Sequence, residues 1–326
     1  MKNKEIIDSF DRKHTYLRIS LTERCNLRCF YCMPENGIEL MPKEHIMKFE
    51  EILKLAETFV SLGVDTIRLT GGEPLVRKNV EGILRELSKL PVKLKLTTNG
   101  ILLDRFYDLF EEIGLKDINI SLDTLDKTKS LFITKRDYYT QVLNNINLGL
   151  KKGFNLKINV VVIRGVNDNE ISEFIKLTRD KNLVVKFIEF MPFKDNNWDP
   201  SKCISEKEIL KMLGKDFSIT KLTDSEHSTS SNYQVEGFNG SFGIISTVTN
   251  PFCSGCNRIR LTANGHMKNC LFARSETDLL TPLRAGEDVS ELILSSIKTK
   301  KFSRDGMDTF TSDQYEKNRA MISIGG

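Results

Sequence analysis

The 326-residue chain has no apolar run that approaches the roughly 20 residues needed to cross a bilayer. It also lacks low-complexity stretches, strict tandem repeats and a strong charge of either sign, since 48 Lys and Arg face 44 Asp and Glu. This composition is typical of a soluble globular protein and excludes membrane, collagen-like and disordered classes. The net charge of +4 does not argue for nucleic-acid binding. The first eight residues are too charged for a signal peptide, so we expect a cytoplasmic protein.

Short segments rich in Ile, Leu and Val alternate with helical patterns over the first 200 residues. These segments are often apolar on both faces, as buried strands of a parallel sheet are. Gly63, Gly114 and Gly153 follow three of the helical patterns, where a left-handed cap would end a helix. We expect strands over 15–20, 65–70, 92–97, 117–121, 156–163 and 184–190, and helices over about 50–62, 79–90, 104–113, 141–152 and 170–181.

Six strand–helix units in series predict an α/β fold, an incomplete (βα)6 TIM-type barrel with fewer units than a closed barrel. The pattern changes at Asp199-Pro200, and a Ser/Thr-rich loop over 223–232 precedes a predicted hairpin of 233–235 and 242–247. We therefore predict a partial barrel over 1–200 and a C-terminal α+β region over 201–326 that covers the open side of the barrel.

Six of the seven cysteines form two triplets, and Cys203 is interpreted as an ordinary core or surface cysteine. In a reducing compartment such clusters indicate metal ligands rather than disulfides. The first triplet, Cys25, Cys29 and Cys32, follows the first expected strand, on the side where such folds hold active sites. A structural zinc ion needs a fourth ligand, and the nearest histidine, His14, is 11 residues upstream. We predict a 4Fe-4S cluster with one iron free to bind a small molecule.

This C-x3-C-x2-C triplet, with Tyr31 before its last cysteine, resembles the signature of the radical S-adenosylmethionine superfamily. The segment 70–74, Thr-Gly-Gly-Glu-Pro, resembles the superfamily motif that contacts the methionine amino group. Its glycines are expected to let the backbone approach the ligand, and its carboxylate or a carbonyl to accept from the ammonium. The resemblance implies one-electron cleavage of S-adenosylmethionine to a 5′-deoxyadenosyl radical, with cofactor contacts from Tyr31, Gly72, Ser121 and Met191.

The second triplet, Cys253, Cys256 and Cys270, has the spacing C-x2-C-x13-C. His266 lies between its last two members, so the spacing alone is compatible with a Cys3His zinc site or with a second 4Fe-4S cluster.

Both triplets and the segments 70–74, 96–100, 119–123 and 187–191 together resemble the GTP 3′,8-cyclase family, over residues 12 to 326. The resemblance implies a lyase with two 4Fe-4S clusters, the second of which binds the guanine of GTP. It implies that hydrogen is taken from C3′ of GTP, that C3′ then bonds to C8, and that this is the first step of molybdenum cofactor biosynthesis. The product, 3′,8-cyclo-7,8-dihydro-GTP, would pass to cyclic pyranopterin monophosphate synthase. The terminal Gly325 and Gly326 predict a flexible end by composition, whereas the resemblance implies a tail that inserts toward the active site.

Basic residues on inward strand faces fit a triphosphate, because an unpaired buried charge is costly and arginine forks match phosphate oxygens. Since side chains alternate along a strand, Arg18 shares a face with Ser20, and Lys157 shares one with Asn159. Thr66 and Lys186 depart from the family pattern, which puts individual phosphate contacts in doubt. The resemblance implies GTP contacts for Arg18, Arg68, Thr97, Lys157, Arg258 and Arg260.

Two alternatives stay open. One is a different radical enzyme with an auxiliary cluster, for instance one that acts on a peptide, and the other is a non-catalytic zinc or iron–sulfur module. The sequence fits a monomer or a homodimer and does not identify the electron donor.

Overall fold

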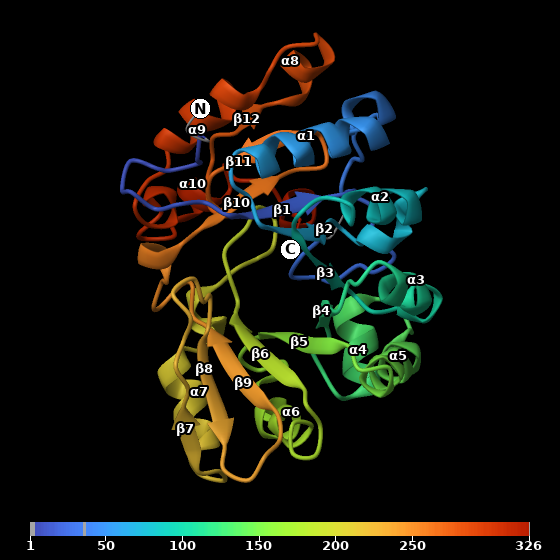
Figure 1. Cartoon of the computed structure of the whole chain (residues 1–326). Coiled ribbons are helices and arrows are strands. Elements are labelled where there is room, and N and C mark those ends of the chain that lie inside the picture. Colours follow the sequence, from blue (N-terminus) through green and yellow to red (C-terminus); the bar gives the residue numbers. More distant parts are fainter. Residues whose placement is uncertain (1–3, 35–36, 326) are drawn as a thin grey trace.

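The computed structural model describes residues 4–34 and 37–325, and within this part twelve strands form one sheet. Its central six strands run parallel and follow one another in chain order (Figure 1). The predicted parallel partial barrel is therefore confirmed. These strands are β1 (Tyr16–Ser20), β2 (Thr66–Thr70), β3 (Lys93–Thr98), β4 (Asp117–Ser121), β5 (Asn155–Val162) and β6 (Val184–Glu189).

The C-terminal region adds strands to both edges of this central sheet. On one edge β9 (Ser241–Ile245) pairs in parallel with β6 and antiparallel with β8 (Ser231–Val235), which confirms the predicted hairpin. On the other edge β10 (Arg258–Leu261) pairs in parallel with β1. The segment between β9 and β10, which carries Cys253 and Cys256, therefore runs from one edge of the sheet to the other. The outermost strands are β7 (Ile219–Lys221), β11 (His266–Lys268) and β12 (Thr277–Asp278).

Helices lie along the outside of the parallel strands (Figure 1). The helix expected over 170–181 ends early, at Lys176, and α4 was not predicted because Leu131 and Phe132 on it are exposed and hide its periodicity. The helices of the barrel are α1 (Phe49–Ser61), α2 (Val80–Leu87), α3 (Tyr107–Glu112), α4 (Lys127–Thr134), α5 (Tyr139–Lys151) and α6 (Ile171–Lys176). Those of the C-terminal region are α7 (Glu206–Leu213), α8 (Leu280–Arg284), α9 (Ser290–Lys298), α10 (Ser312–Tyr315) and α11 (Met321–Ile324).

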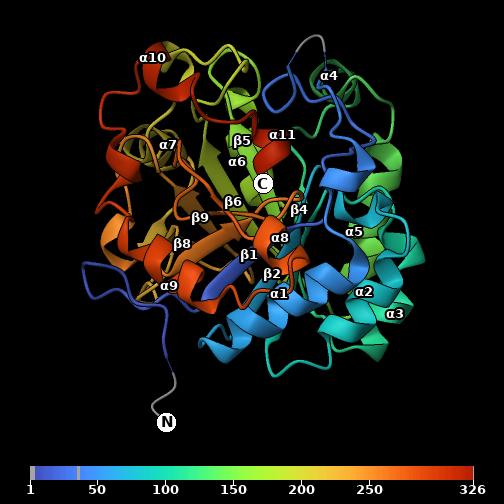
Figure 2. The same ribbon diagram turned by 90° about the horizontal axis from the view of Figure 1, so that it is seen from above.

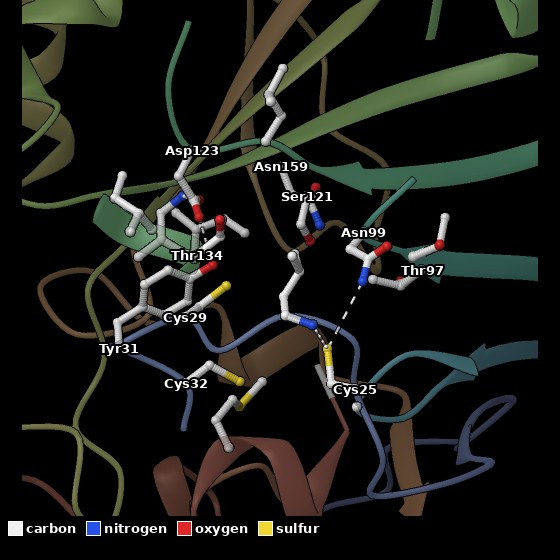
Figure 3. A pocket seen from close by; sticks show the side chains of 18 of the residues that line it. Cys25, Cys29, Tyr31, Cys32, Thr97, Asn99, Ser121, Asp123, Thr134 and Asn159 are labelled. Atoms are coloured by element: carbon white, nitrogen blue, oxygen red, sulfur yellow. Dashed lines mark hydrogen bonds between the residues drawn. The ribbon is translucent and has the colours of Figure 1, made fainter. Parts of the chain in front are cut away.

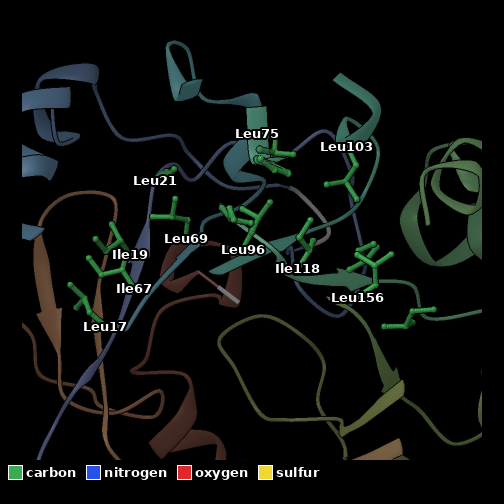
Figure 4. Close-up of a cluster of buried hydrophobic side chains, with 14 of the residues drawn as sticks. Leu17, Ile19, Leu21, Ile67, Leu69, Leu75, Leu96, Leu103, Ile118 and Leu156 are labelled. Carbon is green, nitrogen blue, oxygen red and sulfur yellow. The ribbon is translucent and has the colours of Figure 1, made fainter. Parts of the chain in front are cut away.

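One face of each central strand is apolar and packs against the helices. Leu17 and Ile19 of β1 and Leu69 of β2 are fully buried in one cluster (Figure 4). Phe59 of α1 belongs to the same cluster. Because side chains alternate along a strand, the opposite faces of the same strands carry polar and charged residues toward the interior of the partial barrel. The predicted basic residues Arg18, Arg68 and Lys157 lie on strands β1, β2 and β5.

The prediction of a flexible C-terminal end is wrong for the described residues. Ile322 and Ile324 of α11 are 2% and 1% exposed, because apolar side chains anchor the last turn. Figure 2 shows α11 above the interior of the barrel. Gly326 lies outside the described residues. Within the described part, no helix is both long and apolar enough to span a membrane.

Candidate active site

The three cysteines of the first triplet line one pocket at the carboxyl ends of the parallel strands. Their sulfur atoms turn toward a shared space below Ser121 and Asn159 (Figure 3). The pocket brings the first triplet together with residues predicted to contact S-adenosylmethionine, and with one predicted to contact GTP. These residues are Tyr31, Gly72, Ser121, Met191 and Thr97. Met191 lies two residues beyond the end of β6.

The glycines after β2 allow a close approach to the triplet loop. A Cβ atom on Gly71 would lie 2.6 Å from the Thr22 carbonyl oxygen, and one on Gly72 would lie 2.5 Å from that of Arg24. The Gly72 amide donates to the Thr22 carbonyl (2.7 Å). Only glycine allows this approach, and the two loops are thereby fixed against each other. Both glycines also line the pocket, so the expected approach of a ligand to their backbone stays a prediction.

The Glu73 carboxylate is also used inside the protein. It is 1% exposed and accepts hydrogen bonds from the amide of Asn99 (2.7 Å), the hydroxyl of Thr98 (2.8 Å) and the amide of Leu75 (3.1 Å). Burial raises the pKa of Glu73 to about 7 despite these donors. Its carboxylate therefore holds the ends of β2 and β3 together, and of the two acceptors expected for a ligand ammonium, a carboxylate or a carbonyl, the carbonyl stays the prediction.

Sequence reasoning did not assign a role to Asp123, although it lies in the segment 119–123. Its carboxylate accepts from the Tyr31 hydroxyl (2.7 Å) and the Val161 amide (2.8 Å), and it lines the pocket. Burial raises the pKa of Asp123 to about 6. The only sequence signal was its position two residues after the end of β4. Asp123 fixes Tyr31, and with it the triplet loop, to the strand ends.

The donor set fits an iron–sulfur cluster. Three thiols from one loop face one pocket, and Cys25 Sγ accepts from the Leu27 amide (3.4 Å) and lies 3.9 Å from the amide nitrogen of the Asn99 side chain. Burial raises the pKa values of all three thiols, that of Cys32 to about 12. Such thiols lose their protons when iron binds, and hydrogen bonds to cluster sulfurs tune the cluster.

The second triplet lies beside β10. Burial raises the pKa of Cys270 to about 11, and the thiols of Cys256 and Cys253 are close enough to contribute. Lys300 Nζ lies 3.6 Å from Cys256 Sγ, and this ammonium and Arg258 overcome burial to lower the pKa of Cys256. Arg12 Nη1 donates to the Cys253 carbonyl (2.6 Å), which anchors the loop to the N-terminal segment.

His266 does not complete a zinc site. Its Nδ1 lies 3.2 Å from the Glu276 carboxylate and its Nε2 lies 3.8 Å from that of Asp278, so both ring nitrogens face carboxylates. In the described part of the chain, no three His, Cys, Asp or Glu side chains are grouped so as to hold a single metal ion. A three-thiol donor set suits a cluster with an open iron better than a tetrahedral zinc ion.

Arginines from three adjacent strands line up across the barrel interior. Arg18 of β1 is in register with Arg260 of β10 and with Arg68 of β2. Arg68 donates to the Tyr16 hydroxyl (2.6 Å) and the Leu96 carbonyl (2.8 Å). Arg18 Nε is buried and has no hydrogen-bond partner among the described residues. Burial and the adjacent Arg260 lower the pKa of Arg18 well below its ordinary value. The positive charges of Arg18, Arg68 and Arg260 lie side by side, and this arrangement favours the binding of an anion.

Two lysines extend this basic interior along β5 and β6. Burial and the neighbouring Lys95 lower the pKa of Lys157, and burial with Lys157 lowers the pKa of Lys186 to about 8. Lys186 Nζ donates to the Ser230 hydroxyl (2.6 Å) and also bonds to Asn232. Thr66, the other departure from the family pattern, is buried on the same face of β2 as Arg68 and supplies no charge.

The tail joins the two groups of residues. Met321 of α11 lines the pocket of the first triplet, and the Gly325 carbonyl accepts from Arg260 Nη1 (2.9 Å) beside the second triplet. Met191 and Cys270 pack against one small apolar cluster that includes Ile324. The tail therefore lies between the two cysteine triplets.

Two family models match successive parts of the chain. Residues 19–178 match the Radical SAM superfamily, and residues 183–305 match Molybdenum Cofactor Synthesis C. The crystal structure of Streptococcus suis SuiB superposes with a TM-score of 0.60 at 13% identity, covering 92% of this chain and 69% of that one, which supports the fold alone.

Three relatives illustrate the sequence similarity. The mitochondrial GTP 3′,8-cyclase of Arabidopsis thaliana is 47% identical over 98% of this chain and 83% of its own. The GTP 3′,8-cyclase of Peptoclostridium acidaminophilum is 42% identical over the whole of both chains. Molybdenum cofactor biosynthesis protein 1 of Homo sapiens is 44% identical over 98% of this chain, which spans about half (51%) of the human protein. The chain therefore belongs to the GTP 3′,8-cyclase family of radical S-adenosylmethionine enzymes.

Proposed function

We propose that this chain converts GTP to (8S)-3′,8-cyclo-7,8-dihydroguanosine 5′-triphosphate, the first step of molybdenum cofactor biosynthesis. The cofactors are two 4Fe-4S clusters and S-adenosylmethionine, in keeping with membership of the family. Cys25, Cys29 and Cys32 would hold the first cluster, and Cys253, Cys256 and Cys270 the second.

The observation that carries the choice of substrate is the arginine layer of Arg260, Arg18 and Arg68. A guanidinium fork pairs with phosphate oxygens, and a buried cation without a partner is costly until an anion binds. A peptide substrate, the alternative, would not need three aligned arginines in the interior. The triphosphate would therefore be bound by Arg18, Arg68, Lys157, Arg258 and Arg260. Thr97 would contact GTP beside them, since its hydroxyl accepts a hydrogen bond from Arg68 Nη1 (3.3 Å).

When bound, the first cluster and S-adenosylmethionine supply a carbon-centred radical that abstracts hydrogen. The chain supports this chemistry by positioning and by exclusion of water. Tyr31, fixed by Asp123, and Gly72, Ser121 and Met191 would surround S-adenosylmethionine in the pocket. The tail, through Met321 and Gly325, would separate the cofactor pocket from bulk water and present GTP to it.

Anaerobic turnover tests this function. The reconstituted protein with S-adenosylmethionine and dithionite should convert GTP, but not ATP, into a pterin precursor and should form 5′-deoxyadenosine in equal amount. Arg18→Gln should raise the KM for GTP with little change in the uncoupled cleavage of S-adenosylmethionine. Inert GTP alongside active cleavage of S-adenosylmethionine would favour the radical enzyme that acts on a peptide.

The remaining features of the function rest on the sequence and on the relatives. We propose that the protein acts in the cytoplasm. We place the boundary between the partial barrel and the C-terminal region near residue 200, and we expect a monomer or a homodimer. The product would pass to cyclic pyranopterin monophosphate synthase.

A further inference from the structure

An exposed apolar surface lies on α4, directly outside the loop of the first triplet. Leu131 and Phe132 are 48% and 55% exposed. The last turn of α4 is bonded to the triplet loop, because the Arg28 amide donates to the Thr134 carbonyl (2.9 Å) and the Phe30 amide donates to that of Ile133 (3.2 Å). The exposed side chains are therefore rigidly attached to the loop that carries the cysteines.

A line of aromatic rings connects this surface to the pocket. The Phe132 ring centroid lies 5.8 Å from that of Phe30, and Phe30 lies 5.9 Å from Tyr31 in an edge-to-face contact. Tyr31 lines the pocket of the three thiols, and Phe30 directly follows Cys29 in the chain. The exposed ring of Phe132 thus marks a short route through packed side chains from solvent to the first triplet.

The surroundings of these apolar side chains are basic. Arg28, Lys135 and Arg136 are exposed, and Lys135 Nζ lies 4.6 Å from the Phe132 ring centroid. The exposed Asp137 is paired with Lys127 (3.3 Å), and Asp126 caps the start of α4 through the Lys129 amide (2.7 Å). The α4 surface, defined as Arg28, Leu131, Phe132, Lys135 and Arg136, therefore presents an apolar centre with a positive rim.

The reaction proposed above needs one electron at the first cluster for each cleavage of S-adenosylmethionine, and this inference rests on that proposed function. We infer that the α4 surface docks an acidic one-electron carrier protein. In the complex the carrier loses one electron, the cluster gains one, and no proton or group is transferred. An apolar centre with a charged rim suits transient docking, because rim charges steer the acidic partner and set the rate of association.

The test uses reduced flavodoxin as the acidic one-electron carrier and the anaerobically reconstituted full chain. The dissociation constant and the rate of flavodoxin oxidation are measured for wild type, Phe132→Ala and Lys135→Asp. Aspartate is chosen because Lys135 has φ of 58°, a region that Asp tolerates better than most residues. Lys211→Glu, an exposed charge reversal on α7, is the matched control.

Both α4 variants should bind flavodoxin about tenfold more weakly or oxidise it about tenfold more slowly, and wild-type binding should weaken with added salt. Lys211→Glu should behave as wild type, and dithionite-driven turnover should be equal in all four proteins. Unchanged flavodoxin binding and oxidation in both α4 variants would overturn the docking surface, as would an equal loss in Lys211→Glu.

Conversion of a dimer to a monomer by Phe132→Ala, with flavodoxin binding unchanged, would assign the surface to self-association instead. Absence of GTP turnover with dithionite in wild type would contradict the proposed function. Flavodoxin binding and oxidation would still test the docking surface, because neither measurement requires GTP.

Discussion

The side chain of Arg260 donates a 2.9 Å hydrogen bond to the backbone carbonyl of Gly325. This bond joins the strand beside the second cysteine triplet to the end of the tail. Gly325 has φ of +90°, and a Cβ atom on it would lie 2.5 Å from the Thr70 hydroxyl oxygen and 2.9 Å from Ser20 Cβ. The position therefore requires glycine twice, for its backbone conformation and for its contacts.

Gly325→Ala should displace the tail and lower kcat/KM for GTP by about tenfold to 100-fold, because misplacement near the reacting atoms is costly. Gly286→Ala is the matched control, since Gly286 has φ of +81° but no atom within 4 Å of the place that an added Cβ would take. The control should show the same backbone strain and full activity. Equal activity of both variants would show that the contact at Gly325 is not needed.

Arg18→Met should separate stability from function. Removing the Arg18 guanidinium, whose buried Nε has no hydrogen-bond partner among the described residues, should raise the free energy of unfolding of the ligand-free protein by about 1–3 kcal/mol, while GTP binding weakens. Arg68→Met should instead destabilise the protein, because it leaves the Leu96 carbonyl and the Tyr16 hydroxyl without their donor. Denaturant titrations and GTP binding on the same samples measure both effects. An Arg18→Met variant that binds GTP as wild type does would contradict a phosphate contact.

Lys186 should give GTP binding a dependence on alkaline pH. Burial and Lys157 lower the pKa of Lys186 to about 8, so its ammonium is charged below that pH and neutral above it. The GTP dissociation constant of wild type should rise by up to about tenfold between roughly pH 7 and 9. Lys186→Arg keeps its charge over this range and should flatten the profile. A wild-type profile that is flat, or that the variant reproduces, would show that the charge of Lys186 does not contribute to GTP binding.

Metal content should distinguish a second cluster from a zinc ion. Wild type should hold about eight iron atoms per chain, and Cys270→Ala about four. His266→Ala should leave the iron content unchanged, because both nitrogens of His266 face carboxylates. One zinc ion per chain that is lost in His266→Ala would contradict the iron–sulfur assignment of the second triplet.

The sequence predicted the strands, the amphipathic helices and the cysteine triplets, because each of these features is encoded within a short segment. Apolar strands and amphipathic helices such as α1 have periodic patterns, and the cysteine spacings stand out by residue type. The addition of β9 and β10 to opposite edges of the sheet depends on contacts between distant segments, which no window of sequence contains.

Sequence motifs selected residues that line one pocket, but they did not predict the hydrogen bonds between those residues. The motif left a carboxylate or a carbonyl as the acceptor for a ligand ammonium, and the amides of Leu75 and Asn99 bind the Glu73 carboxylate. Composition alone did not predict an ordered tail, because the burial of Ile324 depends on Phe193 and Phe272 from other elements.

The most direct test of the central claim follows the hydrogen atom at C3′ of GTP. Anaerobic turnover with GTP deuterated at C3′ should yield 5′-deoxyadenosine that carries one deuterium, together with the cyclised nucleotide. Formation of 5′-deoxyadenosine without deuterium, alongside unchanged GTP, would contradict the claim that this chain presents C3′ of GTP to the radical.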